Sequence, residues 1–334
     1  MKKALKIAGI VLGGLVALII VALLVFMLIQ PLLYKPYYDK AEKEFPAAGL
    51  SDGVVPQGFA YDAEAKLYLQ VGYMADGESA SRIYLADEEG NSRFVELLDT
   101  DGNPYLGHTG GIAVSGDRVW MANDGDIEAN DNCVWAISRE ELLDESITQI
   151  ALTECFFPES RSACVAVYDG LLWVGEFYDP EKYPTAESHH LKTPSGETNP
   201  SLICGYTIDE SQPAGIASTI PAKLISVREK LQGFAFNEDG EMALSTSYGL
   251  ANSHIYFYES VLDNEPDTSL KISGADVPVW TLDNSRLTAD LTVPPMSEEL
   301  VAKDGRLYIL YESACNKYIF GNFMRGRQVY SYTF

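Results

Sequence analysis

The hydrophobic and polar positions after residue 56 follow a pattern that recurs five times. Each unit has an apolar strand, a turn containing Gly or an acidic residue, and a second strand rich in aromatic residues. The five hairpins begin at Gln57, Gly110, Ala163, Gln232 and Glu298. Their aligned apolar positions, Phe59, Ile112, Val165, Phe234 and Leu300, are 53, 53, 69 and 66 residues apart. Such self-similarity is typical of a repeat architecture.

Further strands follow each hairpin. Turns such as Asp169-Gly170 and Asp304-Gly305 favour tight β-hairpins. A third apolar strand follows in every unit, and four units have a fourth, at residues 93–99, 148–154, 222–227 and 287–293. This arrangement predicts an all-β, five-bladed β-propeller, with a strand from residues 40–55 closing the ring. A sixth blade within residues 256–296 is the alternative.

An apolar segment precedes the propeller. No charged residue occurs from Ile7 to Ile29, a length of about 34 Å as a helix, which is enough to cross a hydrocarbon core of about 30 Å. Lys2, Lys3 and Lys6 predict a cytoplasmic N-terminus. We therefore expect a cytoplasmic tail (1–6), a transmembrane helix (7–30), a linker with the ring-closing strand (31–50) and an extracytoplasmic propeller (51–334). This is a single-pass protein of the cell membrane, and a long cleaved signal sequence is the alternative.

Charge and cysteine content narrow the choice of partners. The chain has 48 acidic and 24 basic residues, and all the acidic residues follow the apolar segment. Nucleic acid is not expected as a partner, because binding phosphates needs a basic surface. An extracytoplasmic location permits disulfides, and Cys155 and Cys164, which bracket a short segment, are the expected pair.

The propeller fold also predicts where a site would form. The first strand of each blade begins, and the second ends, at the same face near the axis. Candidate ligand-binding residues at these positions are Gln57, Tyr73, Asp124, Arg161, Tyr178, Gln232 and Tyr248. Candidate catalytic residues are His108, Glu176, Glu299 and Glu312, because carboxylates in a low-dielectric channel and a neutral imidazole can act as acids and bases. The alternative is that each carboxylate binds backbone amides and joins blades.

The sequence offers candidate ligands for one cofactor, calcium. Acidic and amide side chains in one long loop have the oxygen ligands that Ca²⁺ prefers, namely Asn123, Asp124, Asp126, Glu128 and Asp131. A solvated acidic loop is the alternative. No G-x-S-x-G, Walker or G-x-G-x-x-G motif occurs, so these motifs give no support to serine-nucleophile or nucleotide chemistry.

Several phrases in the repeats carry a family resemblance. They are VPQGFAYD, GHTGGIAV, LLWVGEFY, LQGFAFNEDG with STSYG, and PPMSEELV with LYILYESACNKY. Over residues 50–334 the sequence resembles bacterial exported, membrane-anchored β-propeller proteins of unassigned function. The resemblance implies the propeller fold and no particular activity. Propellers include calcium-dependent lactonases, glutaminyl cyclases, glycosidases and binding scaffolds, so the fold does not choose among them.

Two functions are consistent with these features. The first is a membrane-anchored, extracytoplasmic propeller that binds a carbohydrate or an envelope protein on its looped face, where Trp and Tyr side chains offer stacking surfaces. The second is a hydrolase or lyase acting on an ester, lactone or glycoside, with the channel carboxylates and His108 as acid and base and Ca²⁺ as a candidate cofactor.

Overall fold

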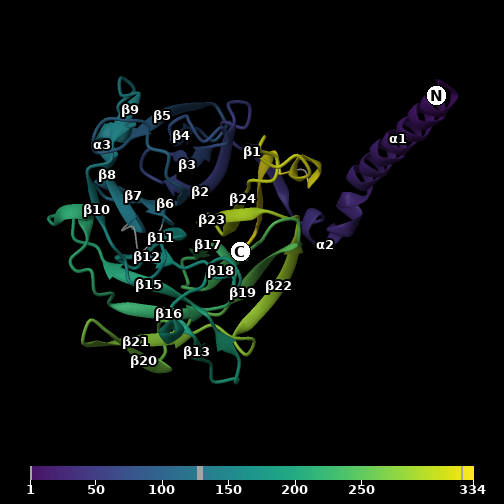
Figure 1. Cartoon of the computed structure of the whole chain (residues 1–334). Coiled ribbons are helices and arrows are strands. Elements are labelled where there is room, and N and C mark those ends of the chain that lie inside the picture. Colours follow the sequence, from purple (N-terminus) through teal and green to yellow (C-terminus); the bar gives the residue numbers. More distant parts are fainter. Residues whose placement is uncertain (1, 126–130, 325) are drawn as a thin grey trace.

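The structure is a computed structural model that describes residues 2–125, 131–324 and 326–334. These residues form one long apolar helix followed by an all-β propeller of five blades, the fold predicted from the sequence (Figure 1). The first strands of the blades lie side by side around the axis.

The first four strands of every blade run antiparallel from axis to rim. Blade 1 contains β2 (Val54–Asp62), β3 (Leu67–Met74), β4 (Arg82–Ala86) and β5 (Ser92–Leu98). Blade 2 contains β6 (Thr109–Ser115), β7 (Arg118–Asn123), β8 (Cys133–Ser138) and β10 (Glu154–Phe156). Blade 3 contains β11 (Cys164–Tyr168), β12 (Leu171–Gly175), β15 (Ser201–Thr207) and β16 (Lys223–Val227). Blade 4 contains β17 (Leu231–Phe236), β18 (Met242–Thr246), β19 (Ser253–Tyr258) and β22 (Leu287–Val293). Blade 5 contains β23 (Ser297–Lys303), β24 (Arg306–Tyr311), β25 (Gln328–Thr333) and β1 (Glu42–Pro46).

The two ends of the propeller sequence meet in blade 5. Strand β1 pairs antiparallel with β25, so that Glu42 lies opposite Ser331 and Lys43 opposite Tyr330. The N-terminal segment thus supplies the outer strand that the C-terminal repeat lacks. We call the side on which first strands begin and second strands end the loop face.

Two segments differ from the expected blade assignment. Residues 148–154 split, because β9 (Gln149–Ala151) adds to blade 1 parallel to β5, whereas β10 completes blade 2. The segment that carried the six-bladed alternative contains β20 (Thr268–Ile272) and β21 (Ala275–Thr281), and β21 pairs parallel with β16. These two strands widen blade 3 instead, so the six-bladed alternative is wrong.

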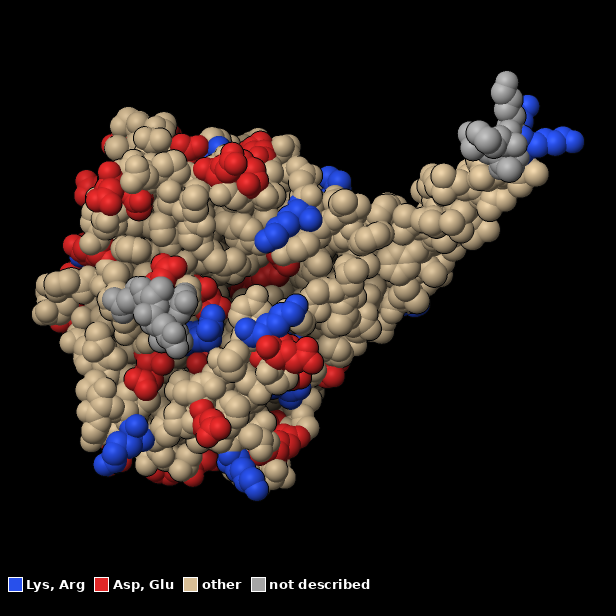
Figure 2. Space-filling model, in the orientation of Figure 1, with Lys and Arg blue, Asp and Glu red and all other residues tan. Residues whose placement is uncertain are grey.

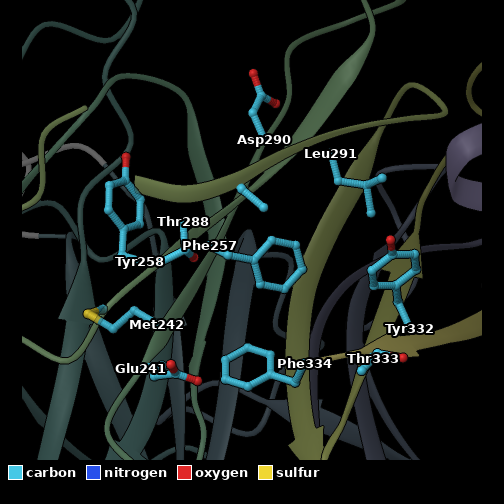
Figure 3. A pocket seen from close by; sticks show the side chains of 11 residues that line it. Glu241, Met242, Phe257, Tyr258, Thr288, Asp290, Leu291, Tyr332, Thr333 and Phe334 are labelled. Atoms are coloured by element: carbon cyan, nitrogen blue, oxygen red, sulfur yellow. The ribbon is translucent and has the colours of Figure 1, made fainter. Parts of the chain in front are cut away.

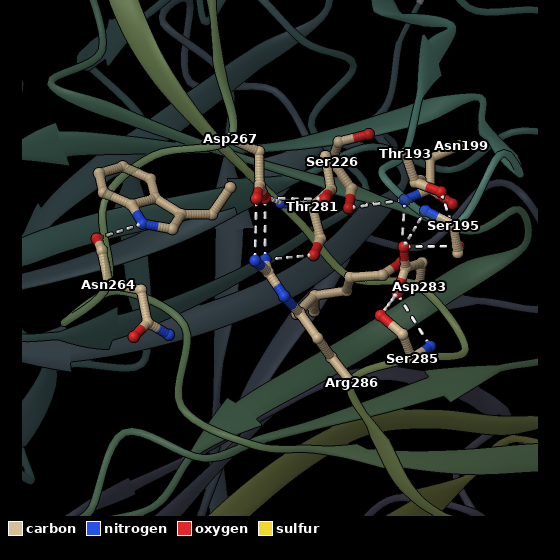
Figure 4. Close-up of polar contacts among 12 residues, drawn as sticks. Thr193, Ser195, Asn199, Ser226, Asn264, Asp267, Thr281, Asp283, Ser285 and Arg286 are labelled. Atoms are coloured by element: carbon tan, nitrogen blue, oxygen red, sulfur yellow. Dashed lines mark hydrogen bonds and ion pairs between the residues drawn. The ribbon is translucent and has the colours of Figure 1, made fainter.

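Polar contacts fix the added strands of blade 3 to their surroundings (Figure 4). Two nitrogens of Arg286 each lie 2.8 Å from a carboxylate oxygen of Asp267, just before β20. The side chain of Asn199, in β14 (Thr198–Asn199), donates to the carbonyl oxygens of Ser226 and Leu282, both at 2.9 Å. The hairpin β20–β21 is therefore an integral part of the blade.

The expected disulfide does not form. Cys155 lies in β10 at the outer edge of blade 2, whereas Cys164 begins the inner strand of blade 3. All five cysteines, each of them described, are free thiols in the structure. The prediction failed because a nine-residue separation between two cysteines spans the full width of a blade.

The helix α1 (Lys2–Leu33) leaves the propeller at blades 4 and 5 (Figure 1). Its segment Lys6–Leu33 has the length and composition to cross a membrane, features that a membrane anchor and a signal sequence share. Figure 2 shows basic side chains near its free end and acidic side chains across the propeller. The following helix α2 (Lys35–Tyr38) packs into the propeller, where Tyr37 is fully buried.

Candidate functional site

Four of the five inner strands begin with a β-bulge, at which the pairing with the second strand shifts by one residue just inside the loop face. The residues at the shifts are Gln57 in β2, Gly110 in β6, Gln232 in β17 and the pair Glu298–Glu299 in β23. A bulge re-aims a side chain by breaking the alternation of the strand. In this way Gln57 and Gln232 come to line a cavity on the axis.

One position after each bulge, neighbouring inner strands touch backbone to backbone. A Cβ atom on Gly58 would lie 2.6 Å from the backbone of Gly111, and one on Gly233 would lie 2.4 Å from the Cα atom of Glu299. No side chain fits at such distances, which explains the glycine in three of the five repeats. In blade 5 the same repeat position is occupied by Glu299.

Glu299 joins the inner strands of three other blades at the axis, a region that we call the hub. Its Oε2 accepts the backbone amides of Phe59 at 3.0 Å and Ile112 at 2.9 Å, and its Oε1 accepts the amide of Val165 at 3.0 Å. These are equivalent residues of blades 1, 2 and 3. Burial raises the pKa of Glu299 well above its usual range, and the three amide donors oppose that rise. Its carboxylate therefore joins blades rather than facing a ligand.

Above this hub, at the loop face, lies a cavity of about 630 Å³ that we call the axial pocket. All five blades supply polar or aromatic side chains to its walls. Blade 1 contributes Gln57 and Tyr73, blade 2 His108 and Asp124, blade 3 Lys182 and Tyr183, blade 4 Gln232 and Tyr248, and blade 5 Glu312 and Tyr318. Such a cavity with convergent polar groups is the usual form of a small-molecule site.

Glu312 is a titratable group of the pocket whose pKa lies near neutrality. Its Oε2 accepts a hydrogen bond of 2.9 Å from Gln57 Nε2, across the junction of blades 5 and 1. Burial raises its pKa to about 7. Burial and the charge of Glu312 raise the pKa of the neighbouring Glu298 well above its usual range. Two buried carboxyl groups this close retain a proton between them at neutral pH.

A second group of side chains lies where blades 1, 2 and 5 meet. Lys317 Nζ donates to the Tyr73 hydroxyl at 2.7 Å and lies 4.5 Å from the centre of its ring. The Tyr73 ring in turn packs against His108, with centroids 5.0 Å apart. His108 is exposed to the pocket but enclosed by the blades, and this enclosure, with the charge of Lys317, lowers its pKa to about 4. Its imidazole is therefore neutral at pH 7.

The opposite wall combines an ion pair with aromatic rings. Arg161 lies 2.6 Å from Asp124 Oδ1 and its guanidinium is 5.8 Å from the Tyr183 ring. Burial raises the pKa of Asp124, although Arg161 opposes the shift. Lys182 Nζ lies 5.5 Å from the centre of the Tyr248 ring. Aromatic faces and charges thus alternate along blades 2 to 4.

Four sequence candidates lie outside the walls of the axial pocket. Arg161 reaches the pocket only through its partner Asp124, and Glu299 binds the hub amides. Tyr178 packs against His190, with ring centroids 5.2 Å apart. Glu176 is buried and accepts from Leu202 N at 3.1 Å and from Arg161 N at 3.3 Å.

The partners of Glu176 explain why it faces away from the pocket. Its Oε2 lies 3.0 Å from His189 Nδ1. Burial lowers the pKa of His189, but the hydrogen bond and charge of Glu176 raise it, and the net direction is upward. Glu176 therefore holds the long loop of blade 3 in place, which is a positioning role. Glu176 and Glu299 thus both bind backbone amides of the propeller, and neither lines the axial pocket.

Sequence reasoning missed Lys182, Tyr183 and Tyr318, which line the pocket from loops. The repeat pattern aligns only strands, so it gives no position for residues in the loops after the second strands. The one available signal was the length of those loops in blades 3 and 5. The sequence does place Glu298 beside the axis, because it has the same repeat position as Gln57 and Gln232.

The loop proposed for calcium is described only in part, since Asp126 and Glu128 lie outside the described residues. Of its other members, Asp124 pairs with Arg161, and Asn123 donates its side-chain amide to the carbonyl oxygen of Asp131. Within residues 2–125, 131–324 and 326–334, no group of three or more His, Cys, Asp or Glu side chains is arranged to hold a metal ion.

Another cavity, of about 450 Å³, lies between blades 4 and 5 toward the opposite face (Figure 3). Phe257, Leu291, Tyr332 and Phe334 dominate its walls, with Glu241 and Asp290 at the edge. Only two blades line it, and it lacks the convergent polar groups of the axial pocket. The axial pocket is therefore the stronger candidate site.

No protein-family model and no curated protein matches the sequence. Among solved structures, the chain is similar to the PQQ-bound aldose sugar dehydrogenase from Streptomyces coelicolor, with 13% identity and a TM-score of 0.49 over 87% of this chain and 96% of that chain. It is also similar to the glutaminyl cyclase from Myxococcus xanthus (9%, TM-score 0.43, 87% and 94%) and to a gluconolactonase from Xanthomonas campestris (12%, TM-score 0.38, 87% and 95%). At such low sequence identity the similarity concerns the fold alone, and no activity is transferred from these proteins.

Proposed function

We propose that this protein is a membrane-anchored, extracytoplasmic propeller that binds a carbohydrate in the axial pocket. The observation that carries the proposal is the convergence of polar and aromatic side chains from all five blades on one cavity of about 630 Å³. A cavity of this size accepts a molecule of a few sugar units, within the usual range of ligand pockets.

The composition of the walls supports a hydroxyl-rich ligand. Gln57 and Gln232 carry amides that both donate and accept, and Asp124 and Glu312 carry acceptors. Tyr73, Tyr183 and Tyr248 add ring faces with hydroxyl groups at their edges. Sugars present alternating hydroxyl groups and apolar C–H faces, so this combination complements both.

The proposed location at the outer side of the membrane is argued from helix α1. The largely apolar segment Lys6–Leu33, 28 residues long, is long enough to span a bilayer. The basic side chains before it favour a cytoplasmic N-terminus by the positive-inside rule, which puts the propeller on the outer side. A cleaved signal sequence would give the same compartment without the anchor, and the apparent mass of the mature chain distinguishes the two.

A glycan array tests the proposal. The full-length chain in detergent is applied to the array together with Gln232→Ala, which removes a pocket amide, and Gln149→Ala, which removes an amide from the exposed strand β9. We expect glycan signals that Gln232→Ala weakens and Gln149→Ala preserves. No signal for the wild type, or equal signals for both variants, would reject carbohydrate binding in this pocket.

The raised pKa of Glu312 favours catalysis as a second candidate function. A carboxyl group with a pKa of about 7 is suited to donate a proton to a leaving oxygen at neutral pH. His108 is neutral in the same pocket and can accept a hydrogen bond from an attacking water molecule, acting as a weak base because its pKa is about 4. This pair supports hydrolysis or lyase cleavage of an ester, lactone or glycoside, with His108 and Glu312 as the catalytic residues.

A substrate screen separates the two functions. Full-length protein is incubated with chromogenic esters, lactones and glycosides, with and without Ca²⁺. Catalysis predicts turnover that Glu312→Gln reduces by at least about a hundredfold, the usual contribution of a general acid. Turnover that persists in Glu312→Gln would exclude this residue as the acid, and glycan binding without turnover would leave binding as the function.

A further inference from the structure

Exposed apolar side chains outside α1 gather at the loop face. Among the described residues, six of the seven large apolar side chains exposed on the propeller lie in loops at this face, and the seventh, Phe94, lies in β5. The six are Leu106, Phe157, Tyr183, Leu250, Ile319 and Phe320. The loop face therefore carries most of the large apolar side chains that the described propeller residues expose.

The membrane-spanning helix joins the propeller at the same face. The end of α1 contacts the short helix η3 (Gly321–Met324), and Gln30 Nε2 lies 3.7 Å from Met324 Sδ. The Tyr34 hydroxyl donates to Asn252 Oδ1 at 2.9 Å, in the loop between β18 and β19. Both contacts are made by loops that follow second strands, which lie at the loop face. A bilayer spanned by α1 is therefore nearest to the propeller at the edge of blades 4 and 5, beside these loops (Figure 1).

One loop connects these features to the axial pocket. In the segment from Tyr318 to Met324, Tyr318 lines the pocket, Ile319 and Phe320 are 74% and 60% exposed, and Met324 contacts α1. Ile319 and Phe320 are the most exposed large apolar side chains of the described propeller residues. They are also next to the point where the chain leaves for the membrane.

We propose that the loop from Tyr318 to Met324, at the blade 5 edge of the loop face, contacts the lipid bilayer, with Ile319 and Phe320 inserted among the lipid chains beside α1. The inference rests on the proposed membrane anchor, because α1 leaves the propeller beside this loop and so fixes which edge approaches the bilayer (Figure 1). Apolar side chains at such a position leave water for the acyl region, whereas the acidic side chains spread over the rest of the visible face stay in solvent (Figure 2).

Tryptophan quenching by brominated lipid tests this contact. Full-length Phe320→Trp and Ile319→Trp are reconstituted into phosphatidylcholine vesicles with or without bromine on the acyl chains. The four native tryptophans are common to every sample and are subtracted with the wild type. We expect the added emission at 319 and 320 to lose most of its intensity in brominated vesicles. Emission from Phe94→Trp, the matched exposed position in β5, stays unquenched.

A third position separates this inference from the proposed anchor. Leu18→Trp lies in the middle of α1 and reports whether that helix is in the bilayer. Quenching at position 18 without quenching at 319 and 320 would overturn the loop contact and leave the anchor intact. Absence of quenching at all three positions would overturn both.

Discussion

Glu299 and Glu312 lie in the same blade, yet their surroundings are opposite. Glu299 is saturated by three backbone amides of other blades, whereas Glu312 accepts from Gln57 and faces the axial pocket. From the sequence both are carboxylates beside an inner hairpin. Their hydrogen-bond partners come from distant repeats, so no local pattern separates a residue that joins blades from one that lines a pocket.

The role of Glu299 predicts a stability change. In Glu299→Gln one oxygen becomes an amide nitrogen, which faces a backbone donor instead of accepting from it. We expect the free energy of unfolding to fall by about 1–3 kcal/mol, the usual cost of a buried unsatisfied donor. Urea denaturation of the full-length chain in detergent measures it. The exposed Glu145→Gln is the control, and an equal effect of both substitutions would contradict the assigned role.

The pKa of Glu312 predicts a pH dependence of stability. A carboxyl group whose pKa is about 7 in the folded protein and 4.5 otherwise binds protons more tightly in the folded state. The free energy of unfolding therefore falls as the pH rises between these two values. Glu312→Gln removes this loss, so the variant gains stability relative to the wild type across the window, by up to about 3 kcal/mol. Parallel curves for the two proteins between pH 4.5 and 7 would contradict the assignment.

At the level of elements, the repeated Gln-Gly and Gly-Gly pairs have two separate roles. The first residue is the bulge that faces the axis, and the second is the glycine at which inner strands touch. Sequence analysis puts Gln57 and Gln232 beside the axis from their order along the strand, and in the structure both line the axial pocket. It gave no reason for the glycines, since backbone contact between blades depends on the diameter of the ring.

The close approach at Gly233 is testable. In Gly233→Ala the new Cβ would lie 2.4 Å from the Cα atom of Glu299, and neither backbone can move without opening the hub. We expect a loss of about 2–3 kcal/mol in the free energy of unfolding, as for overpacked cores. Gly102→Ala, with open space around it and a φ of +83°, carries only the conformational cost of about 1 kcal/mol. Equal losses would contradict backbone contact at the hub.

Outer strands were the least predictable elements. Residues 148–154 read as one strand, but the chain divides them between two blades, and β20 and β21 extend blade 3. Inner strands are buried on both faces and carry a strong apolar signal. Outer strands are short and half-exposed, so the neighbour with which they pair depends on tertiary packing.

At the scale of the whole molecule, the N-terminal segment belongs to the propeller. Besides the pairing of β1 with β25, Tyr37 is buried among Tyr311, Tyr330 and Tyr332, and Phe45 packs against Tyr68. Five repeats, their spacing and the closing strand were accessible from sequence because each repeat carries its own pattern. The contact between α1 and the loop face was not accessible from the sequence, because no local pattern specifies it.

Ring closure predicts a difference between two soluble fragments. Fragment 34–334 keeps Tyr37 and β1, whereas fragment 51–334 loses both and exposes the edge of β25. We expect 51–334 to be less stable by roughly 5 kcal/mol or more, from lost strand hydrogen bonds and aromatic burial, and to associate through its open edge. Urea denaturation and size-exclusion chromatography compare them. Two monomeric fragments of equal stability would show that the closing strand is dispensable.

The convergence of five blades on one binding pocket is tested most directly by calorimetry with one substitution per blade. The strongest glycan from the array is titrated into full-length Tyr73→Ala, Asp124→Asn, Lys182→Ala, Gln232→Ala and Glu312→Gln, with Gln149→Ala as the control. We predict that every pocket variant raises Kd about fivefold or more, corresponding to about 1 kcal/mol each, while the control keeps the wild-type value. Affinity that depends on a single blade, or on none, would contradict a site built jointly by the five.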